Sequence, residues 1–559
     1  MPTFSAVRFT VAETKNAVSA LPIRFPAKQQ PLTLDFTIQI PRTPPALWSV
    51  RADDCLTSLH INEVAVPDAI IQPCHIDRWR HYELGSFFVS GSNTVRAVVQ
   101  DTGGMQGFNM IVARSDFWTS IMRTGFLLST VLLLILFIFR SVRTRESLWI
   151  ISIVGAGIFV RLMYFDGTWF DERGNDLDGH IEYVKYVLSH WSIPPAISGW
   201  QFYQPPLYYF FAAGVAKIAF LFTSSDQIAL RAVHYVSTVL SCVQIWFFYQ
   251  IAALLFRQPK QQLQRILFFT FATFFPSFVI AGAQLNNDAL LQFLAVLTIL
   301  LLLKFWESRS SKHWFLICVV LGLSILTKSN ALLLVPGAVL TLLLLQRTNI
   351  RRKGVLMTAG MLITLCMTSW LYAWRLQETA DLKLIGNVGS LNHHLKVENT
   401  LQSFLLFHPI SIIERPFANS WGGEDRHHFL EYYFRSAHFG EDSFPRVFFL
   451  ARIVVTLSLA TLFLAALSVF MPKLIDWRRA APLFLVALSL FAGHMLFRWH
   501  YPYASSQHFR YSNVTALFFG YLSILSAFQL PRYCRGCMSV LYITAALLNA
   551  VLLLAITIR

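Results

Sequence analysis

Six acidic side chains crowd one polar segment of this chain, between two hydrophobic stretches. The segment runs from Asp166 to Tyr209, and its acids are Asp166, Asp171, Glu172, Asp176, Asp178 and Glu182. Ionisable groups are costly within a membrane, so they mark sites of binding or chemistry there. A positioned carboxylate can take a proton as a general base. We therefore expect this segment to carry the chemistry of the protein.

Asp176 and Asp178 stand at the start of a predicted helix, 177–190. Apolar residues recur along one face of that helix, namely Leu177, Ile181, Val184 and Leu188. We expect the helix to lie on a membrane surface with both carboxylates at its N-terminus, where an ionised carboxylate is stabilised. Helix capping alone would account for one of the two acids. It would not account for the number of acids in so short a segment.

The composition is that of a multi-pass membrane protein. Of 559 residues, 55% are hydrophobic and only 14% are charged, whereas soluble domains carry about 25% charged residues. The net charge of +16 comes from Lys and Arg in short clusters between apolar runs. That placement is typical of cytoplasmic loops under the positive-inside rule and not of nucleic-acid binding. The sequence predicts a lipid bilayer as the surrounding medium and no nucleic-acid partner.

Residues 1–116 differ from the rest because they contain no long apolar run. Segments such as 32–40 and 93–101 alternate polar and apolar residues, which predicts an antiparallel β-sandwich. Cys55 and Cys74 could pair if this domain is extracytoplasmic. The region resembles the galactose-binding-like jelly rolls of carbohydrate-active enzymes, many of which are purely structural. The resemblance rests on Ala52-Asp53-Asp54, Ile61-Asn62, Gly91-Ser92-Asn93 and Gly103-Gly104.

Residues 117–559 are predicted to form an α-helical bundle with about twelve spanning helices, the first at Ser120–Phe139. The loop after this helix is basic and therefore cytoplasmic, because it holds Arg140, Arg143 and Arg145. The β-domain and the acidic segment would then lie outside. The predicted large outer loops are 165–229 and 375–446.

One apolar stretch, Leu207–Phe222, decides this topology. If it crossed the membrane, the basic loop 257–265 and every later basic loop would lie outside. If it lies along the interface, six basic loops fall inside, as the positive-inside rule requires. We therefore predict an interfacial or re-entrant helix here.

The acidic segment resembles the first outer loop of the C-type (GT-C) integral-membrane glycosyltransferases, which include protein O-mannosyltransferases and the bacterial aminoarabinose transferase. That loop begins with an acidic motif, often Asp-Glu-x-x-His, followed by a surface helix and a Pro-Pro-Leu segment. The residues that match are Asp176-Leu177-Asp178-Gly179-His180, the helix to His190, and Tyr203-Gln204-Pro205-Pro206-Leu207. The resemblance implies a GT-C-like fold and Asp176 as catalytic base. Leu177 stands where the family has its second acid, so Asp178 stays an alternative.

Three later turns carry further candidates. Asp288 fits an acidic site that the resemblance implies in the next outer loop, although it could simply cap a helix. Lys328 stands where the family often has Leu-Thr-Lys; it could contact a lipid phosphate or snorkel to the interface. His508 and Arg510 lie where related transferases often carry Phe-Arg-Tyr, and the planar fork of Arg510 could hold a phosphate.

We therefore predict Asp176 and Asp178 as the catalytic residues. The residues predicted to bind substrate are His180, Tyr203, Gln204, Asp288, Lys328, Arg375, His508 and Arg510. No cofactor is indicated with certainty. The acids and His508 leave a divalent metal as an option.

The combined prediction is a polyprenyl-phosphate-sugar-dependent glycosyltransferase of the inner (plasma) membrane, acting on the extracytoplasmic side in cell-envelope assembly. Asp176 would take a proton from a hydroxyl of a glycan, lipid or protein acceptor, whose oxygen attacks the anomeric carbon with inversion. The leaving phosphate needs no general acid, and Arg510 and Lys328 would stabilise its charge. Nucleotide sugars are disfavoured because the chain has no clear G-x-G-x-x-G or Walker motif.

Two other functions are compatible with such a composition. A transporter or flippase of lipid-linked sugars would show inverted repeats and charges within its helices. The sequence shows no internal repeat, and its charges concentrate in the outer loops. An envelope-assembly protein that binds glycan through its β-domain would need far fewer helices than this chain has.

Overall fold

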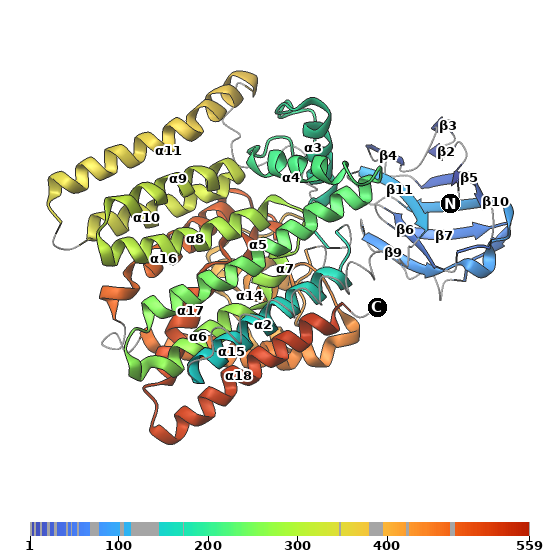
Figure 1. Cartoon of the computed structure of the whole chain (residues 1–559). Helices are drawn as coiled ribbons and strands as arrows, with labels where there is room; N and C mark the ends of the chain where they lie inside the picture. Colours follow the sequence, from blue (N-terminus) through green and yellow to red (C-terminus); the bar gives the residue numbers. More distant parts are fainter. Residues whose placement is uncertain are drawn as a thin grey trace. The chain divides into compact units, whose positions relative to one another are not determined.

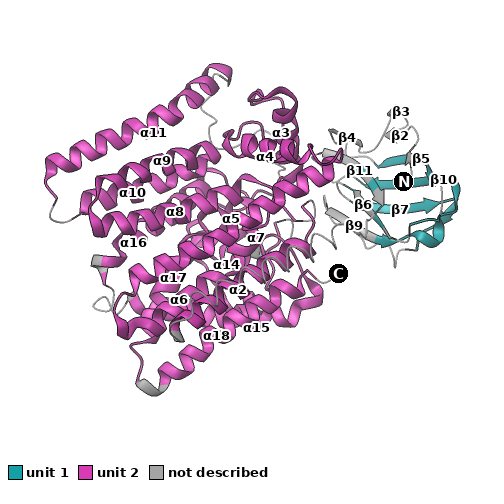
Figure 2. Cartoon of the chain, viewed as in Figure 1, with its two compact units in different colours: residues 1–131, 389–392 teal, residues 132–388, 393–559 magenta. Residues whose placement is uncertain are grey.

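The structure is a computed structural model of the full 559-residue chain. The residues that it describes are 3–4, 7–11, 14–18, 23–26, 31–40, 43–45, 47–52, 55–67, 78–100, 105–112, 145–170, 173–345, 348–379, 395–420, 424–469 and 476–557. The chain divides into two compact units, residues 1–131 with 389–392, and residues 132–388 with 393–559 (Figure 2). Because 113–144 are not described, the predicted domain boundary at residue 116 stays a prediction.

The N-terminal unit contains two antiparallel sheets (Figure 1). The larger has the strand order β3 (Thr14–Val18), β2 (Val7–Val11), β5 (Leu32–Ile40), β10 (Gly91–Gln100), β7 (Cys55–Ile61) and β8 (Val64–Ala65), with β1 (Thr3–Phe4) paired to β5. The smaller has the order β4 (Ile23–Pro26), β11 (Met105–Val112), β6 (Leu47–Ala52) and β9 (Arg78–Glu83). These sheets confirm the all-β prediction, whereas the jelly-roll resemblance stays a prediction.

Alternation along the strands builds one core shared by both sheets. On β5 the buried positions are Leu32, Leu34, Phe36, Ile38 and Ile40, because successive side chains point to opposite faces. The ring of Phe36 lies 6.0 Å, centroid to centroid, from that of Phe108 on β11. Residues of the two sheets belong to the same buried cluster. The unit is therefore a sandwich.

Two asparagines behind the jelly-roll resemblance hold turns together. Asn62 follows β7 in a left-handed conformation, with φ of 52°, and donates to Asn93 Oδ1 (2.8 Å). Asn93 is fully buried and donates to the carbonyl of Val89 (2.8 Å). The two side-chain amides therefore form hydrogen bonds with each other and with backbone groups of the turns. Cys55 is disulfide-bonded; Cys74, its predicted partner, lies outside the described residues.

The second unit is helical. Its helices include α2 (Arg145–Gly167), α5 (Asp226–Leu255), α6 (Gln262–Phe274), α8 (Asn287–Ser308), α9 (Ser311–Thr327), α10 (Leu334–Leu344), α11 (Ile350–Thr379), α15 (Phe448–Val469), α16 (Trp477–His500), α17 (Thr515–Ala527) and α18 (Arg532–Ala555). Other elements in the connections between them include α3 (Leu177–His190), α4 (Leu207–Ala219), α7 (Pro276–Gly282), η3 (Ser329–Leu333), α12 (Leu401–Leu405), α13 (Pro409–Glu414), η6 (Glu424–His427), α14 (Phe429–Phe439), η9 (Ala504–Gln507) and η10 (Phe509–Ser512).

The helices define a multi-pass membrane protein, and the predicted fold class is confirmed. Among the described residues, 7 helices are long and apolar enough to cross a membrane, or up to 8 if the bent pair α6–α7 is one span. Four further apolar helices are shorter, among them α4 and α17. The predicted number of twelve spans is not confirmed. The predicted first span, Ser120–Phe139, lies outside the described residues.

Helix α4 does not cross the bundle. Near the start of α5, Arg231 donates to the carbonyls of Phe165 (2.6 Å) and Thr168 (2.7 Å) at the end of α2. The chain therefore leaves α2 and enters α5 at the same end of the bundle. With 13 residues, α4 is about 20 Å long, and it packs against α3 and α5. This placement agrees with an interfacial helix.

Polar side chains from neighbouring helices donate hydrogen bonds to backbone carbonyls at the break between α6 and α7. Pro276 has no N–H to donate, and the two helices meet at 43°. Arg161, fully buried on α2, donates to the carbonyl of Thr273 (3.0 Å). Gln292 on α8 donates to the carbonyl of Phe278 (3.0 Å). Within the bundle such carbonyls need a protein partner, so these bonds fix α7 and the turn that follows it.

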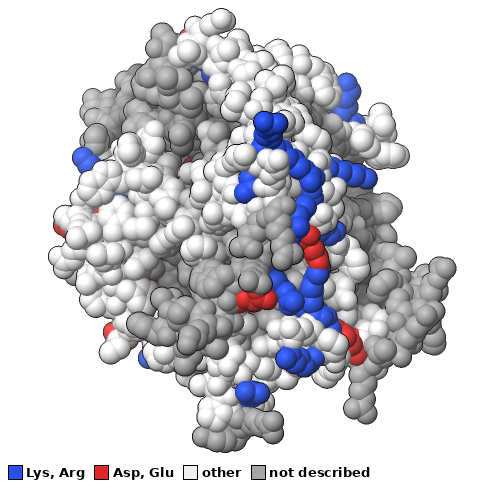
Figure 3. All heavy atoms as spheres, turned by 90° about the vertical axis from the view of Figure 1, so that its left-hand side faces the viewer, with Lys and Arg blue, Asp and Glu red and all other residues white. Residues whose placement is uncertain are grey.

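Basic residues gather at the end of the bundle where α5, α8 and α10 finish. Figure 3 views the molecule from the left-hand side of Figure 1 and shows a stripe of Lys and Arg on that face. The basic residues in the turns at this end include Arg257, Lys260, Arg309, Lys312, Arg351 and Arg352. Two acids there are paired, Glu146 with Arg265 (2.6 Å) and Glu307 with Arg257. The acidic segment lies at the opposite end.

Candidate active site

Asp176 occupies the position before α3 but does not cap the helix. Its backbone is left-handed, with φ of 54°, and its side chain makes no capping hydrogen bond to α3. A non-glycine residue in this conformation is uncommon and strained. Instead the carboxylate lies 3.8 Å from Arg510 Nη2 and accepts from Trp200 Nε1 (3.4 Å). Capping therefore does not explain Asp176.

A buried ion pair stands beside Arg510. Asp288 lies in the first turn of α8, and Asn286 caps that helix by accepting from the Asp288 backbone N–H (3.1 Å). The carboxylate of Asp288 is thus directed elsewhere: its Oδ1 lies 2.6 Å from Lys328 Nζ, and its Oδ2 lies 3.8 Å from Arg510 Nη1. The Asp288 side chain is 3% exposed, whereas that of Asp176 is 40% exposed.

Arg510 joins the two carboxylates. Burial disfavours its charged form, but Tyr511, Asp288 and Asp176 raise the pKa of its guanidinium above the ordinary value. It is therefore a permanent cation. Its Nε is buried with no hydrogen-bond partner among the described residues. The structure thus brings two predicted carboxylates from distant segments, Asp176 and Asp288, to the guanidinium of Arg510. Lys328 lies beside Asp288.

Three further residues extend this cluster and are not predicted from the sequence. The Asn175 amide, in the orientation that satisfies both of its groups, accepts from Arg510 Nη1 (2.6 Å) and donates to Glu441 Oε2 (3.0 Å). Tyr432 donates to Glu441 Oε1 (3.1 Å). Asn175 directly precedes Asp176 in the sequence, so its closeness to the acidic motif could have identified it. Glu441 follows α14, and no spacing in the sequence connects it with Arg510.

Tyr203 and Gln204 link the acidic segment to the turn before α8. Gln204 Nε2 donates to the Tyr203 hydroxyl (3.0 Å), and Asn287 donates to Gln204 Oε1 (3.2 Å). Burial and then the charge of Asp176 raise the pKa of Tyr203, so its hydroxyl stays protonated. Both predicted residues therefore lie in the wall of the site, next to Asp288.

The two predicted histidines are buried and neutral. His180 Nδ1 lies 2.8 Å from the Tyr209 hydroxyl. Burial, followed by the nearby Lys328 ammonium, lowers the pKa of His180 to about 3. Burial also holds the pKa of His508 well below its ordinary value. Neither imidazole carries a charge at neutral pH.

The other two predicted residues, Asp178 and Arg375, have other surroundings than the residues around Arg510. Asp178 lies half-buried in the first turn of α3. Arg375 on α11 donates to the carbonyls of Pro194 (3.0 Å) and Phe202 (2.5 Å) and pairs with Glu378 (2.8 Å). These bonds anchor the stretch that leads to Tyr203. Arg375 thus holds backbone of the acidic segment, and its predicted contact with substrate stays a prediction.

The acids at this site do not fit a divalent metal. Lys328 Nζ already occupies Asp288 Oδ1 at 2.6 Å, and Arg510 faces both Asp288 and Asp176. Two fixed cations stand where a metal ion would have to approach the carboxylates. Asp288 and Asp176 therefore already have protein cations as their counter-charges.

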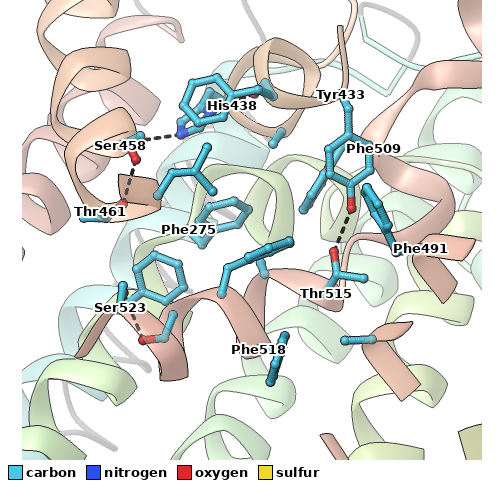
Figure 4. Close-up of a pocket in the computed structure, with 18 of the residues that line it drawn as sticks. Phe275, Tyr433, His438, Ser458, Thr461, Phe491, Phe509, Thr515, Phe518 and Ser523 are labelled. Carbon is cyan, nitrogen blue, oxygen red and sulfur yellow. Dashed lines mark hydrogen bonds between the residues drawn. The ribbon is translucent and has the colours of Figure 1, made fainter. Parts of the chain in front are cut away.

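An apolar cavity of about 550 Å³ lies within the helical bundle. It is lined by residues of α6, α14, α15, α16, α17 and α18, and some of its polar groups bond to one another (Figure 4). His438 Nε2 lies 2.8 Å from Ser458 Oγ, and the Tyr433 hydroxyl lies 2.7 Å from Thr515 Oγ1. Phe509 lines the cavity, and the next residue is Arg510. The wall of the cavity thus includes the residue that precedes Arg510.

One family model matches part of the helical unit. Residues 203–374, from the Tyr203 turn to α11, match the family model described as dolichyl-phosphate-mannose-protein mannosyltransferase. That description names a lipid-linked sugar donor. The match covers less than half of the chain, and it confirms the resemblance to the C-type glycosyltransferase superfamily. Comparison with curated proteins gave no match.

Three solved structures are similar to this chain. ArnT from Cupriavidus metallidurans, bound to undecaprenyl phosphate, is 13% identical over 70% of this chain and 62% of its own, with a TM-score of 0.43. An Archaeoglobus fulgidus oligosaccharyltransferase tethered to an acceptor peptide is 12% identical over 73% of this chain and 55% of its own, with a TM-score of 0.42. Arabinosyltransferase EmbB from Mycobacterium smegmatis is 9% identical over 94% of this chain and 51% of its own, with a TM-score of 0.38. Each match spans less than two thirds of the solved chain.

Replacing His180 should change how stability depends on pH. The unfolded imidazole takes up a proton near pH 6.5, but the folded one does so only near pH 3. Stability is therefore lost as the pH falls below about 6.5. We expect His180→Asn to show a shallower fall in Tm between pH 6.5 and pH 4, measured by intrinsic fluorescence in detergent. His190→Asn, at an exposed position on the same helix, is the control. Parallel curves for His180→Asn and wild type would contradict the assignment.

Proposed function

We propose that the chain transfers a sugar from a polyprenyl-phosphate-linked donor to an acceptor hydroxyl, with inversion at the anomeric carbon. The observation that supports this most is the position of Arg510. It lies between a half-exposed carboxylate, Asp176, and the buried Asp288–Lys328 pair, and it directly follows a residue that lines the apolar cavity. A lipid phosphate needs both a cationic clamp and an apolar channel for its chain.

Exposure separates the roles of the two carboxylates. A general base must reach the acceptor hydroxyl, and the Asp176 side chain is 40% exposed. Asp288 is 3% exposed and already paired with Lys328, so it would have to break that pair to act as a base. We therefore assign Asp176 as the base and Asp288 as the residue that positions Lys328 and Arg510. Asp178 is the alternative base.

The cations serve the leaving group. As the acceptor oxygen bonds to the anomeric carbon, the bond from that carbon to the phosphate oxygen breaks, and its electron pair stays on the phosphate. Arg510 and Lys328 stabilise the charge that develops there. Asp176 holds the proton released by the acceptor. The phosphate is a good leaving group, so this site needs no second acid.

His508 supplies a further donor toward the phosphate. Its Nδ1 accepts from the backbone N–H of Arg510 (3.0 Å), so the neutral ring carries its proton on Nε2. That Nε2 is buried with no hydrogen-bond partner among the described residues. A buried N–H without an acceptor is costly. A phosphate oxygen at Arg510 would provide the missing acceptor.

The sugar-transfer proposal is tested with purified protein and a panel of synthetic polyprenyl-phosphate hexoses and pentoses. We expect Asp176→Asn to lower kcat by about 10²- to 10⁴-fold, because general-base catalysis supplies that much. Asp226→Asn is the matched control, since Asp226 is exposed and pairs with surface Lys185 at the same end of the bundle.

The outcomes separate the alternatives. Loss of activity in Asp178→Asn with Asp176→Asn unaffected would move the base to Asp178. Full activity in both variants would remove the base mechanism. If wild type turns over none of the donors, transport of lipid-linked sugars becomes the better account.

We also propose that the β-sandwich and the Asp176 end of the bundle face the extracytoplasmic side of the inner membrane. The basic turns at the opposite end support this orientation. The disulfide at Cys55 supports an oxidising compartment for the β-sandwich.

The orientation can be measured by protease accessibility in intact spheroplasts. An epitope inserted after exposed Glu63, in the turn between β7 and β8, should be cleaved. An epitope in the turn at 309–311 should be protected until the cells are permeabilised. Protection of the epitope after Glu63 and cleavage of the one at 309–311 would contradict the proposed orientation.

A further inference from the structure

Three side chains with metal-ligating atoms meet outside the cluster around Arg510. His408 immediately precedes α13, His428 immediately precedes α14, and Glu431 lies in the first turn of α14. One ligand atom from each lies within 4.8 Å of the others. All three belong to the long connection between α11 and α15, at the end of the bundle that carries the acidic segment.

The local folding of this connection explains why they meet. His428 and Glu431 are three residues apart at the start of a helix, so their side chains share one face. The His408 backbone N–H donates to Glu431 Oε1 (3.0 Å), which fixes the start of α13 against the start of α14. The two imidazole rings are 5.6 Å apart between centroids and are tilted by 55°.

The separation of His428 from Glu431 suits a small cation bound at Glu431 Oε1. His428 Nδ1 lies 3.3 Å from this oxygen, and ligand atoms about 2.0–2.1 Å from a tetrahedral zinc are roughly 3.3 Å from one another. His428 Nδ1 is buried and forms no hydrogen bond with the described residues. His408 Nδ1 hydrogen-bonds to the same oxygen at 2.7 Å, so a bound cation would take the place of this hydrogen bond.

The second carboxylate oxygen is held from the other side. Arg435, one turn further along α14, places its Nη2 3.3 Å from Glu431 Oε2, and both side chains are 1% exposed. This cation holds Oε2 and leaves Oε1 on the side of the histidines, as outer partners of metal ligands do. Arg435 also donates to Ser411 on α13 (3.1 Å). The contacts of Glu431 with His408 and of Arg435 with Ser411 therefore connect α13 with α14.

We propose that His408, His428 and Glu431 bind a Zn²⁺ ion that joins α13 to α14. Two imidazoles and one carboxylate are ligands that zinc prefers, whereas magnesium and calcium prefer sets of oxygen ligands. Three protein ligands leave one position for water. The His408 side chain is 52% exposed, which gives the ion a path from solvent.

The role of this zinc is to hold the outer connection in place. The residue after Glu431 is Tyr432, which donates to Glu441 at the edge of the proposed active site. By fixing the start of α14, the ion would hold Tyr432 in place. The proposal does not depend on sugar transfer, because its test measures bound metal.

The test is elemental analysis of the full-length protein, purified without chelators from zinc-supplemented cells. We expect about one zinc per chain, reduced at least tenfold in His408→Ala and in His428→Ala. His427→Ala is the matched control and should keep the zinc, because His427 is adjacent but outside the cluster. Asp176→Asn should keep it too. Zinc-free wild type, unchanged zinc in both cluster variants, or stoichiometric iron in place of zinc would overturn the assignment.

A second measurement covers the case in which a variant folds poorly. Chelator-treated wild type titrated with Co²⁺ should develop the visible absorption of a four-coordinate site, and Zn²⁺ should displace it. The chelator should lower the Tm of wild type, and added Zn²⁺ should restore it. Absence of the cobalt spectrum together with a Tm unaffected by the chelator would refute the site.

Discussion

The proposed active site depends on one buried cation, Arg510, held between two carboxylates of unequal exposure. A buried guanidinium is costly unless charges of opposite sign surround it. Asp288 and Asp176 each lie 3.8 Å from it, close enough to compensate its charge but too far for a direct hydrogen bond. The positive charge of Arg510 is thus compensated by nearby carboxylates, while its Nε remains available to donate to a phosphate. Lys328, in contact with Asp288, adds a second positive charge.

The rest of the bundle serves to bring these residues together. Asp288 comes from the turn after the broken helix α6–α7, whose carbonyls Arg161 and Gln292 satisfy. Lys328 lies between α9 and η3, and Arg510 lies between α16 and α17. Polar residues deep in the bundle therefore have a structural purpose. They allow an irregular turn to exist next to apolar helices and so place a carboxylate beside two cations.

Sequence reasoning predicted the architecture because its signals are local. Alternation along 32–40 predicts β5, and long apolar runs predict the spanning helices. The acidic residues of the candidate site were selected because a charged side chain is costly in a membrane protein. Asp176 could have been a helix cap, and only the structure shows that Asn286 caps α8 while Asp176 caps nothing. The number of spans was less predictable, since α9, α10 and α17 are short. Glu441 and Tyr432 could not be found, because their proximity to Arg510 arises from tertiary folding of a long connection.

The central claim is that Arg510 receives the phosphate of a lipid whose chain occupies the adjoining apolar cavity. The most direct measurement is a structure of the protein with bound polyprenyl phosphate, determined by electron cryo-microscopy in a lipid nanodisc. We expect a phosphate oxygen about 2.7–3.2 Å from the Arg510 guanidinium and the first isoprenyl units against Phe509. A phosphate bound away from Arg510, Lys328 and His508 would contradict it.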